Sequence, residues 1–85
     1  MEYHLAIPSH RRAEMLGKKT LTFLRASNAP KPTVYVSDEQ DLTDYRNLYP
    51  ELEICLAPKG IAATRNYIQD IQPLGKKIVY IDDDI

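Results

Sequence analysis

The chain contains no tryptophan, a single cysteine and no long hydrophobic run among its 85 residues. One thiol, Cys55, cannot form a disulfide within the chain, which favours a reducing compartment. No apolar stretch approaches the roughly 18 residues of a membrane-spanning helix, and the N-terminus lacks the basic and apolar segments of a signal peptide. We therefore expect a cytoplasmic protein that does not enter a membrane.

The sequence also lacks an excess of either charge, since 11 basic residues stand against 12 acidic ones. The net charge of −1 creates no field over the whole molecule that would attract nucleic acid or a membrane surface. His4, His10 and Cys55 do not have the spacing of zinc ligands. The length is below the roughly 100–200 residues of an average domain, which excludes a multidomain enzyme within this chain.

Short apolar runs alternate with longer segments of helical periodicity along the whole chain. Strands are predicted at 3–7, 33–36, 52–56 and 78–81, with helices over about 10–27, between Ser37 and Pro50, and between Gly60 and Pro73. This βαβαβαβ pattern predicts an α/β fold with a Rossmann-like parallel sheet and right-handed crossovers. In the common strand order 3-2-1-4, ligands bind where the order reverses, between the first and fourth strands.

Local signals predict how the helices begin and which side chains are buried. Ser9 is a candidate N-cap for the first helix, and Ser37 with Gln40 has the spacing of a capping box for the second. Asp41 and Asp44 are expected on the surface of that second helix. Five tyrosines are expected to pack in the core and at its rim, rather than to stack on a nucleobase: Tyr35, Tyr45, Tyr49, Tyr67 and Tyr80.

Charged residues follow the first and fourth predicted strands, whose carboxyl ends share one edge of the sheet. Pro8-Ser9-His10-Arg11-Arg12 comes after the first strand and Asp82-Asp83-Asp84 after the fourth. Because alternate residues of an extended segment point to the same side, Asp82 and Asp84 can face one ligand. Carboxylates beside a basic pair predict a site for a divalent cation and a diphosphate. A solvated acidic end of the chain is the alternative interpretation.

Two further segments follow the second and third predicted strands. Asp38 is placed to meet a ribose hydroxyl or a base, or else to cap the helix that follows it. Lys59 and Gly60 precede the third helix, whose N-terminus attracts phosphate. Because Gly60 has no side chain, a ligand can come close to the backbone there. Arg65 lies about one and a half turns into that helix, where its side chain can reach the strand ends. An ordinary surface arginine is the alternative.

Four segments, in this order along the chain, carry a resemblance to a known family. They are Ile7-Pro8-Ser9-x-Arg11, the acid at Asp38, Gly60-Ile61-Ala62-Ala63-Thr64-Arg65-Asn66 and Tyr80-Ile81-Asp82-Asp83-Asp84-Ile85. Together they resemble the N-terminal half of GT-A-type nucleotide-sugar glycosyltransferases. Within that fold they are most similar to the TET-associated glycosyltransferases, a phage-rich group linked to glycosylation of modified DNA bases.

The resemblance implies the donor-binding domain of a metal-dependent glycosyltransferase that binds a nucleotide-diphosphate sugar, with a UDP-sugar as the favoured donor. It also implies Mn²⁺ or Mg²⁺ as the cofactor, a modified DNA base as a candidate acceptor, and a bacterial or phage-infected cell. The metal ligands carried over from the family's D-x-D motif are Asp82 and Asp84. The nucleotide-sugar-binding residues carried over are Pro8, Ser9, Arg11, Asp38, Lys59, Gly60, Arg65, Asp82 and Asp83.

The length departs from the family pattern, because a GT-A domain continues well beyond its D-x-D motif. We therefore expect residues 1–85 to form the donor-binding subdomain without the acceptor half. The chain alone is then expected to be inactive unless a C-terminal half or a second copy completes it. A non-catalytic nucleotide-binding or interaction module with the same sheet is the alternative function.

Overall fold

The computed structural model describes residues 3–72 and 75–81. The strands are β1 (His4–Pro8), β2 (Thr33–Val36), β3 (Glu53–Leu56) and β4 (Ile78–Tyr80). The helical elements are α1 (Ala13–Leu16), the π-helical turn η1 (Gly17–Leu21), α2 (Thr22–Ala26), α3 (Glu39–Leu48) and α4 (Ile61–Ile71). The predicted alternation of strands and helices is confirmed.

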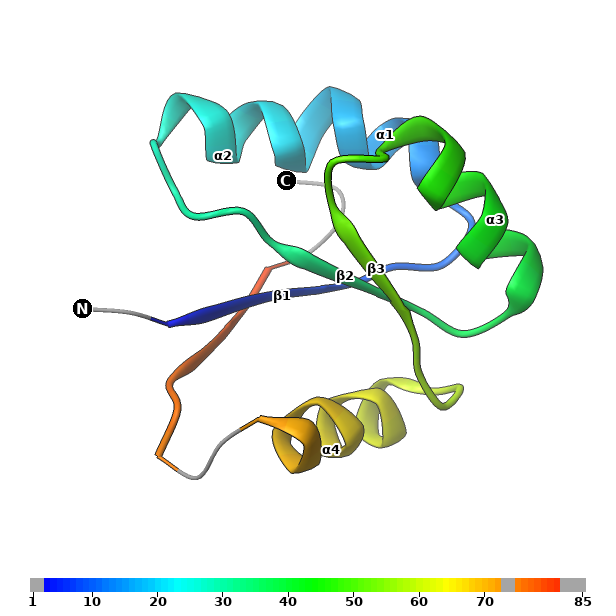
Figure 1. Ribbon diagram of the computed structural model, residues 1–85, viewed down its shortest axis with the longest axis vertical. Helices are drawn as coiled ribbons and strands as arrows, with labels where there is room; N and C mark the ends of the chain where they lie inside the picture. Colours follow the sequence, from blue (N-terminus) through cyan, green and yellow to red (C-terminus); the bar gives the residue numbers. More distant parts are fainter. Residues whose placement is uncertain (1–2, 73–74, 82–85) are drawn as a thin grey trace.

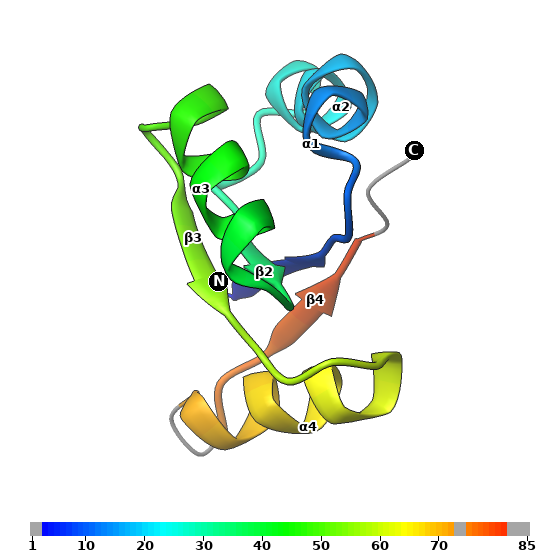
Figure 2. The same ribbon diagram turned by 90° about the vertical axis from the view of Figure 1, so that its right-hand side faces the viewer.

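All the pairings in the sheet are parallel, and the strands lie in the predicted order β3-β2-β1-β4. The continuous segment α1–η1–α2 and helix α3 cover one face of the sheet, and α4 covers the other (Figure 1, Figure 2). Because the strands are parallel, their carboxyl ends point to one edge, where the loops after β1, β2 and β3 come together. No helix within the described part of the chain is long and apolar enough to cross a membrane.

The two central strands are buried on both faces, and their alternation divides the core in two. Leu5 and Ile7 of β1 point to the face covered by α1–η1–α2 and α3, where they join the larger cluster of buried side chains. Ala6 of β1 and Tyr35 of β2 point to the other face, where they pack with Ile68 of α4. Near-continuous apolar runs are typical of parallel strands covered by helices on both sides.

The first helical segment differs from the single helix predicted over 10–27. Helix α1 begins only at Ala13 and has no side-chain cap, so the prediction that Ser9 caps it is wrong. The backbone then widens into the π turn η1 before it continues as α2. The Tyr49 hydroxyl donates to the carbonyl oxygen of Ala13 and lies against Gly17, where any Cβ would obstruct it. A residue from the end of α3 thus packs into this turn, which the local sequence pattern could not reveal.

Helix α3 is capped by Asp38, the alternative role that the sequence leaves open for this residue, and not by the Ser37 capping box. The carboxylate of Asp38 accepts a hydrogen bond from the Asp41 backbone N–H at 2.8 Å, so Asp38 is the N-cap. The predicted capping box of Ser37 and Gln40 is therefore wrong, and the Gln40 side chain donates instead to Asp44 at 3.0 Å. The helix starts one residue later than the box requires, which makes Asp38 the residue whose oxygen reaches the free N–H.

The tyrosines take the packing roles that the sequence predicts. Tyr35 and Tyr45 are among the largest fully buried side chains of the described residues. Tyr49 is partly buried against the larger cluster, and Tyr67 and Tyr80 are partly buried against the smaller one. Their rings therefore form core and rim contacts.

His4 and Tyr35 form a hydrogen-bonded pair near the start of β1. The His4 Nε2 and the Tyr35 hydroxyl oxygen lie 2.8 Å apart, and the two rings meet edge to face. Burial lowers the pKa of His4; nearby Glu53 opposes this effect and nearby Lys76 adds to it. Burial also raises the pKa of Tyr35 to about 12. The native state therefore favours a neutral imidazole here.

This pair predicts a fall in stability in mild acid. Because the pKa of His4 is lowered in the folded state, the unfolded chain binds the proton more readily, and stability is lost as the pH falls below about 6.5. Urea midpoints measured between pH 8 and pH 5 should fall less for His4→Gln than for the wild type. The same pH dependence in both proteins would contradict a role for His4.

Candidate functional site

An open cavity of about 430 Å³ lies at the carboxyl edge of the sheet. It is formed by the loops that follow β1, β2 and β3, together with the start of α4. Its lining residues are Pro8, Ser9, His10, Arg12, Tyr35, Ser37, Lys59, Gly60 and Thr64. We call this the rim cavity. Its position is the one at which open parallel sheets bind ligands.

Four residues predicted from the sequence line the rim cavity: Pro8, Ser9, Lys59 and Gly60. They come from two loops about fifty residues apart, which the parallel arrangement of β1 and β3 brings to the same edge. Asp38 follows β2 at the same edge, and its carboxylate lies within 4.8 Å of a ring nitrogen of His10, which lines the cavity. The sheet thus gathers these predicted residues around one space.

Arg11 and Arg65 are placed differently. Arg11 lines a neighbouring groove of about 1020 Å³ between α1–η1 and α3, which we call the helix groove, whereas Arg12 lines both spaces. The guanidinium of Arg65 lies over the ring of Tyr80, 5.2 Å from its centroid, and Arg65 is not among the residues that line the rim cavity. Asp82, Asp83 and Asp84 lie outside the described residues.

The start of α4 gives the rim cavity an electropositive wall. Gly60 precedes the helix with a φ of +102°, a conformation that residues with a Cβ rarely adopt, and among the described residues no side chain caps the first turn. The free N–H groups of a helix N-terminus attract anions, and Lys59 adds a positive charge beside them. The Thr64 hydroxyl donates to the Pro58 carbonyl oxygen at 2.7 Å, which holds this turn in place. The arrangement is suited to a phosphate or another anionic group.

The other wall of the rim cavity is the loop Ser9–Arg12, which side chains of α3 hold from behind. The Tyr45 hydroxyl lies 2.5 Å from Ser9 Oγ and accepts a hydrogen bond from the Arg12 backbone N–H at 2.9 Å. One oxygen of Asp41 accepts from the Arg11 backbone N–H at 3.0 Å. Three hydrogen bonds to Asp41 and Tyr45 of α3 therefore hold the loop, and they include both of its ends.

The prediction for Asp41 is wrong. It was expected on the surface of α3, but it is only 3% exposed, whereas Asp44 is exposed as expected. Asp41 lies four residues before Tyr45, so the two side chains share one face of α3, and that face is buried. This spacing is the sequence signal that could have found Asp41, although only the fold shows that the loop Ser9–Arg12 covers it.

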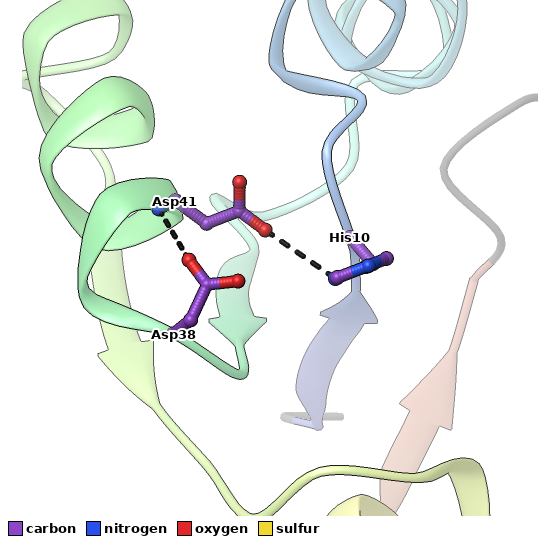
Figure 3. Close-up of side chains that lie close together, drawn as sticks. All are labelled: His10, Asp38 and Asp41. Carbon is purple, nitrogen blue, oxygen red and sulfur yellow. Dashed lines mark hydrogen bonds and ion pairs between the residues drawn. The ribbon is translucent and has the colours of Figure 1, made fainter.

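His10, Asp38 and Asp41 form a cluster whose side chains point toward one another (Figure 3). Their nearest ligand atoms all lie within 4.8 Å, and His10 Nδ1 lies 3.5 Å from an Asp41 oxygen. An imidazole nitrogen with two carboxylates is a donor set that suits Mn²⁺ or Zn²⁺. However, both carboxylates already accept backbone N–H groups, and the positive end of the α3 dipole disfavours a cation. The contacts within the protein therefore account for the cluster without a metal.

Comparison with known proteins identifies a family for the chain. Neither a search of curated proteins nor a search of solved structures returned a match. The sequence model of the TET-associated glycosyltransferases matches residues 3–85, which include the segments that line the rim cavity. A match over nearly the whole sequence shows that the chain belongs to the TET-associated glycosyltransferase family.

Proposed function

We propose that the rim cavity binds the nucleotide-diphosphate sugar of a metal-dependent glycosyl transfer. The observation that carries this proposal is the convergence of Pro8, Ser9, Lys59 and Gly60 on one cavity at the ligand-binding edge of the sheet. Membership of a glycosyltransferase family supports it, because such enzymes require a donor site. A UDP-sugar is the donor we propose.

Each wall of the cavity suits a different part of this donor. Lys59 and the uncapped N-terminus of α4 would meet the diphosphate, where charge-assisted hydrogen bonds are strongest. Pro8 and Ser9 would line the nucleoside, with Asp38 toward its base or ribose. Asp38 already accepts the Asp41 N–H through one carboxylate oxygen, and its other oxygen can accept a hydrogen bond from the ligand.

We propose Asp82 and Asp84 as ligands of Mn²⁺ or Mg²⁺, with Asp83 beside the donor. Such a cation would neutralise charge that develops on the leaving diphosphate. The Ile81 N–H donates to the Ala6 carbonyl oxygen at 3.0 Å, so the chain still follows β1 at the residue before this acidic run. Arg11 and Arg65 remain predicted contacts of the diphosphate. Their positions outside the rim cavity mean that side-chain movement would be needed for contact.

Transfer itself requires an acceptor site, which we propose lies in a further C-terminal half or in a second copy of the chain. A modified DNA base is the acceptor class that we propose from the family. A nucleotide-binding module without chemistry would use the same rim cavity. Release of UDP from a UDP-sugar together with glycosylation of added DNA that carries a modified base separates an active glycosyltransferase from such a module.

The test of the donor site is a calorimetric titration of UDP with and without Mn²⁺. Asp84→Asn is expected to weaken Mn²⁺-dependent binding about tenfold, since lost contacts to a charged group are worth roughly 1–3 kcal/mol. Asp70→Asn, which removes an exposed carboxylate of α4, is the matched control and should bind as the wild type does. Equal affinity with Mn²⁺, with chelator and in Asp84→Asn would overturn the metal-dependent donor site.

A further inference from the structure

We propose that Asp41 and Tyr45 are positioning residues that set the shape of the loop Ser9–Arg12, so that His10 and Arg12 face the rim cavity. This inference rests on the proposed function for its consequence in ligand binding. The contacts behind it belong to the fold alone and can be tested separately.

Tyr45 attaches both ends of the loop to α3. Its side chain is fully buried, and its hydroxyl contacts Ser9 Oγ at one end and the Arg12 N–H at the other. Ser9 itself is held a second time, because its N–H donates to the Tyr35 carbonyl oxygen at 2.9 Å. A buried hydroxyl that bridges two groups of one loop restricts that loop more than a single contact would.

Asp41 holds the middle of the same loop. It accepts from the Arg11 N–H at 3.0 Å and lies 3.5 Å from the imidazole of His10. Its own backbone N–H is bound to Asp38, so its position at the start of α3 is fixed. The side chain of Asp41 is 5% exposed, whereas that of His10 is 55% exposed. The buried aspartate is therefore held in place by the protein, and the histidine that contacts it faces the solvent.

The loop needs these contacts because its backbone is unusual. Arg11 has a φ of +52°, in the left-handed region that a residue with a Cβ seldom occupies. With this turn in place, His10 and Arg12 line the rim cavity while Arg11 lines the helix groove. The contacts with α3 therefore select which of two neighbouring arginines lines the rim cavity.

The test compares two tyrosines of the same region. Tyr45→Phe removes the hydroxyl that holds the loop, and Tyr49→Phe is the matched control because its hydroxyl bonds to Ala13 in α1. We expect Tyr45→Phe to weaken UDP binding about fivefold, the effect of one ordinary hydrogen bond, and to change the affinity for uridine much less. Tyr49→Phe should lower the melting temperature but leave the ratio of UDP to uridine affinity unchanged.

A second pair of variants addresses the carboxylate. Asp41→Ala should reduce the preference for UDP over uridine, and Asp41→Asn should restore most of it, because the amide oxygen still accepts from the Arg11 N–H. Asp44→Asn, on the exposed face of α3, is the control and should change nothing. A preference that is the same in the wild type, Tyr45→Phe and Asp41→Ala would overturn the inference.

Amide hydrogen exchange separates this inference from the proposed function. The Arg11 and Arg12 amides should exchange faster in Tyr45→Phe and Asp41→Ala than in the wild type, with or without a ligand. Unchanged exchange of both amides overturns the positioning role even if UDP binds. Absence of UDP binding to the wild type in Mn²⁺ overturns the donor site instead, and the exchange rates then decide whether the loop is held as proposed.

Discussion

Ile68→Ala is expected to lower the free energy of unfolding by about 2–5 kcal/mol, the usual cost of deleting a large buried aliphatic side chain. Ile68 of α4 is fully buried, and it packs with Ala6, Tyr35 and Ala57 on that face of the sheet. The cluster is small, so the neighbouring side chains have few ways to fill the space left by the deletion. Urea unfolding followed by circular dichroism measures the loss.

Ile71→Ala is the matched control, since it removes the same atoms from the same helix. Ile71 is 46% exposed, and we expect its replacement to cost no more than about 1 kcal/mol. Helix α4 also carries one wall of the rim cavity through Gly60 and Thr64, so Ile68→Ala should weaken UDP binding under conditions in which the protein is still folded. Similar losses of stability for the two variants would show that α4 is not anchored through Ile68.

Gly17→Ala is expected to cost about 2–3 kcal/mol, toward the upper part of the range for overpacking a filled site. A Cβ at this position would meet three atoms of the Tyr49 side chain, namely its hydroxyl oxygen and two ring carbons at 3.1 Å. Helix propensity alone favours alanine over glycine, so the two effects have opposite signs and the clash decides the result. Thermal or urea unfolding of the purified variant measures it.

The double variant Gly17→Ala with Tyr49→Phe tests whether Tyr49 is the cause. Tyr49→Phe alone loses the hydrogen bond to the Ala13 carbonyl oxygen and should be mildly destabilising. Once the hydroxyl is gone, the added Cβ meets only the ring, so the double variant should be more stable than the sum of the single losses predicts. Additive losses would mean that Gly17 is required for another reason, such as the backbone of the π turn.

The sheet and its ligand-binding edge could be predicted from residue patterns. The runs that contain Ile7, Val34 and Ile54 are too short and too apolar for surface helices, and the segments between them repeat at helical spacing. Strands that alternate with helices must run parallel, and parallel strands bring the residues after them to one edge. The same reasoning predicts that Pro8, Ser9, Lys59 and Gly60 lie at that edge, where they line the rim cavity.

The sequence by itself therefore determined the α/β architecture and the edge at which the candidate site lies, because both follow from periodicities within short segments. Only the tertiary structure decided that Asp41 is buried and that Arg65 stacks on Tyr80. It also decided that Arg12 lines the rim cavity while Arg11 lines the helix groove. These features depend on contacts between residues that are 15 to 36 positions apart, such as those of Tyr80 with Arg65 and Tyr45 with Ser9. A local pattern records which face of a segment is polar, but not which distant segment covers it.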